Sequence, residues 1–483
     1  MKAICLLVMA IWSTTCLPAA QYYSSYDASL GGSGTLMSPW TLKVALTNSV
    51  ILSGDTLWLR GGTYTGLFLA QLHGTNASPV TVRNYANERA IIDGQLDLDV
   101  STYTWLLGLE FIDSQKATRS NPFETIRMGS IGTKVINCLI HDCCNGIAPP
   151  GVYEAYGNVM WNCGKSGLEH ALYYQNNGIA AKIIEDNLIG YPSGFGVHCY
   201  GTLGEMKNLS VIGNAVWEPG NAIDPKAGIL LGGALPVIDG VIVSNLVYSR
   251  GPGIQIGYAA SDTNATVTDN YSVGSPSVTV KTVFDSLVIT NNTFGTVESL
   301  VVSSPSNFIS SGSRIWDRNS AYSVKFNWDV RYAVVGGTNM GFTDWKTQSG
   351  FDAASTYSNS YPMDRVVVRP NRYAAKRANI VAVNWAAAEN VSADVSGVLS
   401  IGDPYDLISA QNYFAGSVKS GIYDGSPLQI PMTNLSIAPV LYWTPSNSLI
   451  NVTTNFAAFV LVGRSPTAQA TANSATVGRI SVR

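Results

Sequence analysis

Seven short segments in which an asparagine precedes two mostly apolar residues recur along the chain, and they restrict its fold more than any other feature. The recurring asparagines are Asn137, Asn158, Asn187, Asn214, Asn245, Asn270 and Asn292. They follow one another at steps of 21, 29, 27, 31, 25 and 22 residues, with β-branched runs and no helical periodicity between them. Self-similarity at this period predicts a β-solenoid, in which each repeat adds one coil of short strands and tight turns.

A second mark follows five of these asparagines and locates another strand of each coil. It is a glycine, or once an alanine, before an apolar residue, and it starts at Gly146, Ala171, Gly196, Gly228 and Gly253. Successive coils of such a fold stack about 4.8 Å apart. An asparagine suits the turn between strands, because its amide can bond to the asparagine of the next coil. We therefore predict a ladder of hydrogen-bonded asparagines in an all-β chain.

The composition excludes several classes of partner. Charged residues are 13% of the 483 residues and the net charge is −3, whereas an ordinary soluble domain has about 25% charged residues. Nucleic acids and acidic membranes are bound by clustered Lys and Arg, which the sequence does not contain. The 24 Tyr, 11 Trp and 46 Gly predict a surface of hydroxyls, amides and aromatic rings, which favours contact with sugars.

The N-terminus and the cysteines indicate the compartment. Residues 1–20 are typical of a secretory signal, with Lys2 before the apolar run 3–12 and small residues before Gln21. That run is half of the roughly 20 residues of a spanning helix, so we expect a secreted chain, extracellular or periplasmic, without a membrane span. The five cysteines after the signal are expected to be buried thiols, and a disulfide framework is the alternative, although an odd number cannot pair completely.

The N-terminal segments after the signal carry a family resemblance. They read GDTLWLRGGTY at 54–64, PVTVRNY at 79–85 and IIDG at 91–94. Over about 25–330 the chain resembles the right-handed parallel β-helix proteins of the pectin-lyase-like superfamily. The resemblance implies a right-handed parallel β-helix that acts on a polysaccharide. It does not single out an activity, because the superfamily includes pectate and alginate lyases, polygalacturonases, chondroitinase B, epimerases and phage tailspike hydrolases.

The organisation of the chain follows from where the repeat ends. We expect the signal over 1–20, the parallel β-helix over 21–330 and a connector over 331–360. From residue 364, short alternating runs are separated by Gly-Asp, Asp-Gly and Ser-Pro turns, which predicts a small antiparallel β-sandwich over 361–467. The Ser, Thr and Ala-rich segment 468–483 is expected to be a disordered tail.

Two insertions at one corner of the solenoid locate a candidate cleft. The distances from the ladder asparagine to the next glycine or alanine mark are 9, 13, 9, 14 and 8 residues. The longer ones hold WNCGKSGLEH at 161–170 and WEPGNAIDPK at 217–226. These segments lie two coils apart, on the order of 10 Å, with the Asn187 coil between them. Insertions of a solenoid usually flank its binding face, so we expect the cleft there.

Side chains for chemistry and for binding converge on this corner. The candidate catalytic residues are Glu169, His170, His198, Glu218 and Asp224. Alternation along the strands after each mark sends a column of side chains outward, and with the insertion lysines it gives the substrate-binding candidates. These are Lys165, Tyr173, Gln175, Tyr200, Lys226 and Gln255. For Glu169, Glu218 and Asp224 the alternative is a solvated loop charge or a cap on a turn, and for His170 it is a bond to the backbone.

Two chemistries fit such a cleft. Glycoside hydrolysis needs two carboxyl groups, which Glu169 and either Glu218 or Asp224 would supply across the gap. Uronate β-elimination needs a neutralised substrate carboxylate and a base, for which His170, Tyr173, His198 and Lys226 are candidates. No metal site is expected in the sequence, although Ca²⁺ would serve if the protein is a lyase.

The competing interpretation is a non-catalytic β-helix that binds glycans or builds a surface or matrix. We expect a monomer whose partner is a polysaccharide. Because the outward columns hold few Lys and Arg, a neutral or weakly charged glycan is favoured over a densely acidic one.

Overall fold

The computed structural model describes residues 19–120, 122–127, 129–176, 178, 180–202, 204–220, 223–295, 300–302, 313–323 and 332–464. The signal expected over 1–20, except for its last two residues, lies outside this part of the chain. The expected tail over 468–483 and two residues of the second insertion, 221 and 222, lie outside it as well.

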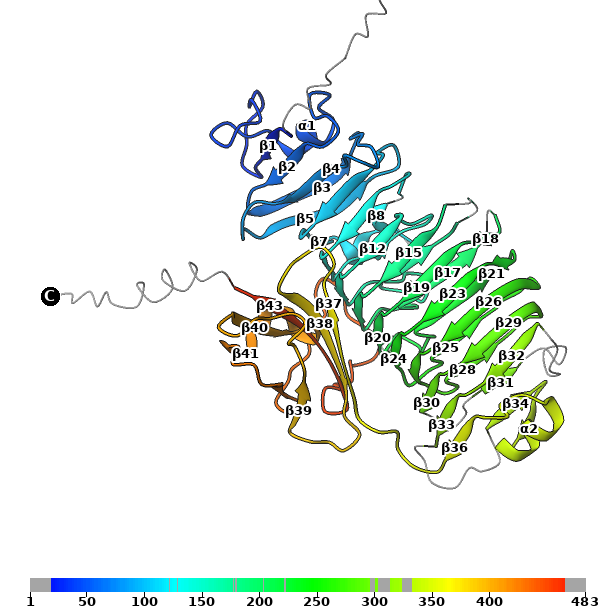
Figure 1. Ribbon diagram of the computed structural model, residues 1–483. Coiled ribbons are helices and arrows are strands. Elements are labelled where there is room, and N and C mark those ends of the chain that lie inside the picture. The colour runs from blue at the N-terminus through cyan, green and yellow to red at the C-terminus, as the bar shows by residue number, and fades with distance from the viewer. Residues whose placement is uncertain are drawn as a thin grey trace, which may run out of the picture.

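Three columns of parallel strands form the long body of the molecule (Figure 1). The first column consists of β1 (Gln21–Ser24), β2 (Thr56–Leu59), β4 (Val80–Asn84), β6 (Thr104–Leu107), β9 (Lys134–Ile136), β12 (Glu154–Tyr156), β15 (Lys182–Glu185), β19 (Leu209–Ile212), β23 (Gly240–Val243), β26 (Asp262–Thr268), β29 (Phe284–Thr290) and β32 (Arg314–Asp317). The second column consists of β7 (Glu110–Ile112), β10 (Leu139–His141), β13 (Val159–Trp161), β16 (Leu188–Gly190), β20 (Ala215–Trp217), β24 (Leu246–Tyr248), β27 (Tyr271–Val273), β30 (Thr293–Gly295), β33 (Ser320–Tyr322) and β36 (Thr356–Ser358). The third column consists of β8 (Glu124–Arg127), β11 (Asn145–Ile147), β14 (Leu172–Tyr174), β17 (Val197–Gly201), β21 (Ile229–Gly233), β25 (Ile254–Ile256), β28 (Val278–Val280), β31 (Leu300–Val302) and β34 (Ala333–Val335).

Each coil therefore contributes one short strand to each column. Near the N-terminus two longer strands, β3 (Gly62–Leu69) and β5 (Ala90–Asp97), pair with each other, and β5 then pairs with both β7 and β8. A minor pair, β18 (Met206–Lys207) and β22 (Val237–Ile238), lies in the loops. Inward-facing aliphatic residues of all three columns form one continuous core. This architecture confirms the predicted all-β parallel β-helix.

An asparagine ladder joins the coils at the corner between the first and second columns. Its members are Asn158, Asn187, Asn214, Asn245, Asn270, Asn292 and Asn319, none more than 2% exposed. Asn187 donates its backbone N–H to Oδ1 of Asn214 at 3.0 Å, and Asn214 donates to Oδ1 of Asn245 at 2.9 Å. The predicted ladder is confirmed, and it extends one coil further than the sequence pattern suggested.

The first coil of the ladder was assigned one residue too early. Cys138, not Asn137, donates its backbone N–H to Oδ1 of Asn158, at 2.9 Å. Asn137 instead has φ 52°, and the residue before each later ladder asparagine is also left-handed, as at Gly157 and Gly213 with φ 65° and 67°. The turn therefore places its left-handed residue before the ladder position, and Asn137 fills that place because asparagine tolerates it.

Helices close both ends of the body. The helix α1 (Leu42–Leu46) packs buried side chains on the first coils. At the other end lies α2 (Phe342–Ser349), where Trp345 is fully buried and stacks on Trp316 at 5.3 Å between ring centroids. The hairpin strand β35 (Thr338–Met340) precedes it. The structure differs here from the expected connector over 331–360, because β34 completes the coil of Asn319 by pairing with β31, and β36 adds one more strand by pairing with β33.

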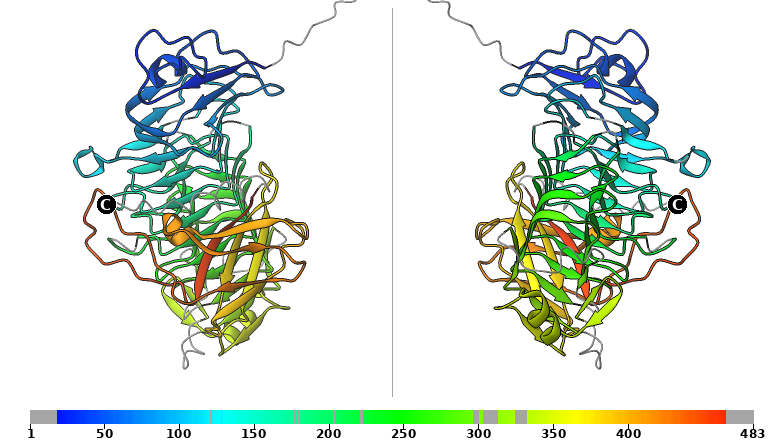
Figure 2. Two further views of the ribbon diagram at one scale, coloured as in Figure 1. Left: turned by 90° about the vertical axis from the view of Figure 1, so that its left-hand side faces the viewer. Right: turned by 90° about the vertical axis from the view of Figure 1, so that its right-hand side faces the viewer.

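A small antiparallel domain follows and packs beside the second column (Figures 1 and 2). Its main sheet has the order β37 (Arg365–Pro370), β38 (Arg377–Val383), β43 (Phe456–Gly463), β40 (Pro404–Ser409) and β41 (Ser417–Ile422). A second pair, β39 (Asn390–Ala393) and β42 (Leu428–Pro431), encloses a core with it, which confirms the predicted β-sandwich. The outer face of the main sheet covers Trp161 and Trp217 of the helix. The expected bounds 361–467 stay a prediction.

Buried thiols and the absence of a long apolar helix complete the description. All five cysteines after the signal are free and buried, as expected, and Sγ of Cys143 lies 3.5 Å from Sγ of Cys163. Within the described ranges, no helix has the length and apolar character needed to cross a membrane.

Candidate active site

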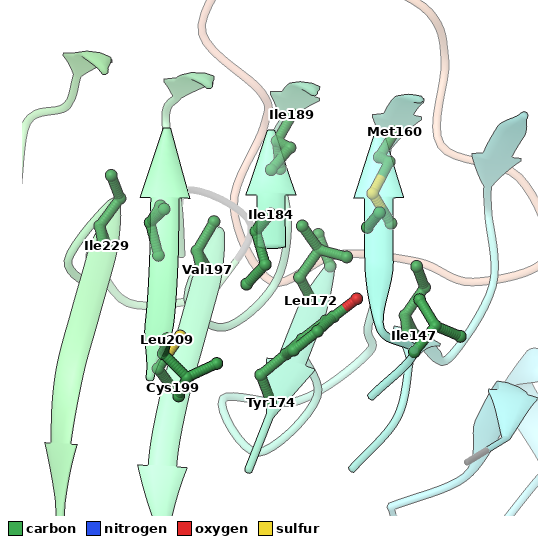
Figure 3. Close-up of a cluster of buried hydrophobic side chains, with 14 of the residues drawn as sticks. Ile147, Met160, Leu172, Tyr174, Ile184, Ile189, Val197, Cys199, Leu209 and Ile229 are labelled. Atoms are coloured by element: carbon green, nitrogen blue, oxygen red, sulfur yellow. The ribbon is translucent and has the colours of Figure 1, made fainter. Parts of the chain in front are cut away.

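The outer face of the third column presents the predicted outward residues. Strand β14 pairs with β17 so that Leu172 lies beside Val197 and Tyr173 beside His198. Alternation sends Leu172, Tyr174, Val197 and Cys199 into the core, where Figure 3 shows them among other apolar side chains. Tyr173 and His198 consequently point away from the core, as the sequence predicted.

Six rings gather on this face and are called the aromatic patch below. Its members are His170, Tyr173, Phe195, His198, Tyr200 and Tyr258. The ring of His198 lies at the centre, with its centroid 4.1 Å from His170, 4.5 Å from Phe195 and 4.8 Å from Tyr173. Tyr200 lies 5.2 Å from His198 on its other side, and Tyr258 lies 5.0 Å from Tyr200.

His170 is held in place by the backbone around it. Its main-chain N–H donates to Oδ1 of Asn145 at 2.7 Å, and its Nδ1 accepts the N–H of Phe195 at 3.0 Å. Burial lowers the pKa of His170 well below its ordinary value, and the charges of His198 and Lys226 add to this. The backbone role anticipated for His170 is thus present, and its ring is neutral at neutral pH.

His198 has no comparable fixation. It is 8% exposed, and its Nδ1 is buried without a hydrogen-bond partner among the described residues. Burial lowers its pKa to about 3, so the imidazole is neutral over the physiological range. A buried polar atom left unpaired costs about 1–3 kcal/mol. A histidine with a purely structural role would bring this cost without a benefit, so the unpaired Nδ1 favours a role in binding or chemistry.

The two insertions meet beside the aromatic patch, whereas the sequence predicted a gap on the order of 10 Å between them. Lys226 belongs to the second insertion and Gly167 to the first. A Cβ atom added to Gly167 would lie 3.5 Å from Cε of Lys226, so the two insertions are in contact. Between them runs the segment 191–195: Ser193 donates its N–H to the carbonyl of Cys163 at 2.8 Å, and Gly220 donates to the carbonyl of Pro192 at 2.7 Å. Backbone hydrogen bonds thus close much of the expected cleft. The aromatic patch beside it is the surface that is left as a candidate for binding a substrate.

Glu169, expected to be catalytic, has another role. Its side chain is fully buried, Oε1 accepts the N–H of Phe123 at 3.1 Å, and Oε2 accepts the N–H of Lys165 at 2.8 Å. Both oxygens therefore tie two loops together. The carboxylate is a cap on backbone donors, which is the alternative that the sequence left open.

Glu218 and Asp224 do not face Glu169 across a common cavity. Glu218 is 1% exposed and accepts Nε of Arg250 at 2.8 Å, and burial raises its pKa. Its charge acts on Tyr191 and Tyr248, which lie in the cluster under the C-terminal domain. The Asp224 side chain is exposed and forms an ion pair with Nζ of Lys226 at 2.9 Å. The carboxylate pair proposed for hydrolysis is therefore not assembled.

The remaining candidates lie around the aromatic patch in different ways. Gln175 donates Nε2 to the hydroxyl of Tyr173 at 3.3 Å and to Oγ1 of Thr202 at 2.8 Å. Gln255 continues the outward column but is 6% exposed and donates to the carbonyl of Gly257. Lys165 points elsewhere, because its Nζ donates to the carbonyls of Ala117 and Arg119.

Sequence reasoning missed two members of the aromatic patch, Phe195 and Tyr258. Phe195 precedes the Gly196 mark just as His170 precedes Ala171, so the same offset contained the signal. Tyr258 follows the end of β25 by two residues, and nothing in the repeat marked that loop position.

The described side chains do not fit a metal ion. Within the ranges given above, no three His, Cys, Asp or Glu side chains gather in a way that would hold one. Calcium is bound by six to eight oxygen ligands, several of them carboxylates. We therefore derive no step of a reaction through Ca²⁺.

Comparison with known proteins gives a local likeness and a shared architecture. No family model matches the chain. A pectate lyase of Emericella nidulans, PEL9, is 37% identical over 91 residues, which is 17% of this chain and 22% of that protein. The chain thus matches about a fifth of the length of that relative.

Solved structures overlap the chain more widely but more loosely. A xylose complex of XylC is 9% identical over 85% of this chain and 95% of that one, with a TM-score of 0.44. A rhamnogalacturonan lyase is 13% identical over 71% of this chain and 90% of that one, with a TM-score of 0.39. The coils, the three parallel columns and the asparagine ladder of the chain itself make it a parallel β-helix protein.

Proposed function

We propose that the protein is an enzyme that cleaves an extracellular polysaccharide laid across the aromatic patch. The observation that carries the proposal is His198, an outward-facing neutral imidazole with an unpaired, buried Nδ1 among rings that sugars can stack on. Aromatic faces are common platforms for ligands with apolar and polar surfaces. Export by the segment 1–20 is part of the proposal.

Among cleavage reactions, β-elimination fits the residues better than hydrolysis. Hydrolysis needs two carboxyl groups on either side of the scissile bond, and Glu169 and Glu218 are occupied by backbone amides and by Arg250. The local likeness to a pectate lyase also favours elimination. This preference implies a uronate polymer rather than the neutral glycan that the scarcity of Lys and Arg suggested.

The proposed step follows from the two side chains at the centre of the aromatic patch. The carboxylate of a bound uronate, placed beside the ring, would raise the pKa of His198 from its low value in the free protein, and the imidazole then accepts the C5 proton. The electron pair of that C–H bond forms the C4–C5 double bond, the C4–O bond breaks, and the leaving oxygen takes a proton from the hydroxyl of Tyr173. That hydroxyl accepts a hydrogen bond from Gln175, so its own proton is free to be donated. Lys226, whose charge acts on His170, would balance the substrate carboxylate after exchanging its exposed ion pair with Asp224 for one with the substrate.

The test is an activity panel with the full chain on pectate, alginate and chondroitin, with and without Ca²⁺. Elimination gives an unsaturated product, so ultraviolet absorbance rises together with the number of reducing ends. Reducing ends without absorbance would mean hydrolysis and would overturn the assignment of the reaction. Binding without either signal would favour the non-catalytic glycan-binding protein that the exposed rings also fit.

A further inference from the structure

A groove of about 680 Å³ separates the outer face of the first coils from the C-terminal domain. On the helix side it is lined by residues of β4 and β6, among them Arg83. On the domain side it is lined by Tyr373 and Arg377, and by Phe414 of the short helix η3 (Ala410–Ala415). Its lining residues are all different from those of the aromatic patch. The volume lies within the range of about 300–1,000 Å³ that is typical of ligand sites.

The acidic residues of the groove are already neutralised. Glu88 accepts Nε of Arg60 at 2.9 Å, and Asp406 forms an ion pair with Arg464, whose Nε lies 3.2 Å from Oδ2 of Asp406. Glu110 accepts a hydrogen bond from a guanidinium nitrogen of Arg89 at 2.6 Å, and its carboxylate also contacts Nε2 of His141 at 3.1 Å. None of these carboxylates is left to compensate a further cation.

Two guanidinium groups remain uncompensated. Arg83 and Arg377 have no acidic partner among the described residues, and the Nε of each is buried without a hydrogen-bond partner. Arg83 lies over the ring of Trp58 at 4.9 Å, and burial lowers its pKa with no acid acting in the other direction. Both arginines are partly buried, and an unpaired cation in such a place is stabilised by an anion, so the two guanidinium groups indicate an anion site in the groove.

We propose that the groove binds an acidic sugar unit of a polysaccharide through its carboxylate, apart from the site of cleavage. The planar forks of Arg83 and Arg377 match a carboxylate, and the aromatic residues Tyr373, Tyr413 and Phe414 line the groove in which the sugar would lie. The groove would hold a polymer by a second point, which raises avidity for long chains over short ones. This inference does not depend on cleavage at the aromatic patch.

Calorimetric titration with oligogalacturonate tests the proposal in a His198→Ala background, which separates binding from turnover. Arg83→Gln and Arg377→Gln should each weaken binding about ten-fold or more, whereas Arg318→Gln, which removes an exposed Arg elsewhere on the chain, should not. A neutral galacto-oligosaccharide should bind much more weakly. If both groove variants bind like Arg318→Gln, the proposal is wrong.

Two further readouts distinguish a sugar site from other roles. Inorganic phosphate as the titrant should bind more weakly than the oligosaccharide, and equal binding would reduce the groove to a general anion site and contradict the proposal. Without ligand, Arg377→Gln should melt no lower than Arg318→Gln, because it removes an uncompensated charge. A collapse of its melting temperature would assign the guanidinium a structural role instead.

Discussion

Replacing Asn214 by Ala removes an interior member of the asparagine ladder. The Oδ1 of Asn214 accepts the backbone N–H and Nδ2 of Asn187, at 3.0 and 2.8 Å. Its Nδ2 donates to the carbonyls of Ile184 and Ile212 and to Oδ1 of Asn245, at 2.9, 3.2 and 3.0 Å. The substitution therefore deletes five buried hydrogen bonds and leaves the N–H of Asn187 without a partner.

The cost follows from these partners. A net hydrogen bond contributes about 1 kcal/mol, and an orphaned buried donor costs about 1–3 kcal/mol, but the bonds share partners and do not add fully. We expect Asn214→Ala to lower the free energy of unfolding by about 3–5 kcal/mol, a large part of what a domain has. The exposed Asn390 in β39 is a matched control, and its change to Ala should cost less than about 0.5 kcal/mol.

Urea unfolding followed by tryptophan fluorescence measures this difference. Hydrogen exchange adds a local readout, because the amide of Asn187 should exchange faster in Asn214→Ala than in the wild type. If Asn214→Ala costs under about 1 kcal/mol and the Asn187 amide stays protected, the ladder is not what joins the coils.

Three other outcomes are expected. The pKa of His198 is lowered to about 3 in the fold, whereas its ordinary value is about 6.5, so below pH 6.5 the unfolded chain binds more protons than the folded chain. The melting temperature should therefore fall between pH 6.5 and 3, and it should fall less in His198→Phe. An equal fall in both proteins would exclude His198 as a cause. Glu169→Ala leaves the amides of Phe123 and Lys165 unpaired, so it should lower the free energy of unfolding in urea by about 2–4 kcal/mol. An unchanged free energy would mean that the Glu169 carboxylate does not hold these amides and is available for chemistry. Trp217→Ala opens a cavity under the C-terminal domain, so it should lower the free energy of unfolding by about 3–5 kcal/mol and make that domain more sensitive to limited proteolysis. An unchanged digestion pattern would contradict tight packing of the domain on the β-helix.

The fold was predictable because each coil of a solenoid needs similar residues at the same positions, so the sequence repeats with the length of a coil. The apolar residues after each mark, such as Leu172 and Val197, enter the core, and the hydrogen-bonded asparagines follow from their spacing. The misplaced first coil has a physical reason: a left-handed turn and a ladder position accept the same residue type, so Asn137 looked like a member. The final strand β36 has no asparagine before it, because Ser355 takes the ladder position and accepts the N–H of Asn319.

The site was predictable only where alternation decides orientation. Tyr173 and His198 are neighbours on paired strands, and strand period alone brought them together. The carboxylates behaved differently because their partners come from loops. Glu169 is bound by an amide 46 residues away, and no pattern in the sequence indicates that contact. The rings of Trp161 and Trp217 are covered by a sheet that begins at Arg365, 204 residues after the first and 148 after the second, and no pattern in the sequence indicates that contact.

The most direct test of the proposed active site compares two histidine variants on the uronate polymer that the wild type cleaves. His198→Ala removes the proton acceptor of the aromatic patch, whereas His73→Ala removes an exposed histidine that contacts Thr102 elsewhere on the helix. We predict that His198→Ala lowers kcat by about 100-fold or more, with a melting temperature within a few degrees of the wild type, and that His73→Ala retains full activity. Full activity in His198→Ala, or a loss of activity explained by unfolding, would contradict catalysis at the aromatic patch.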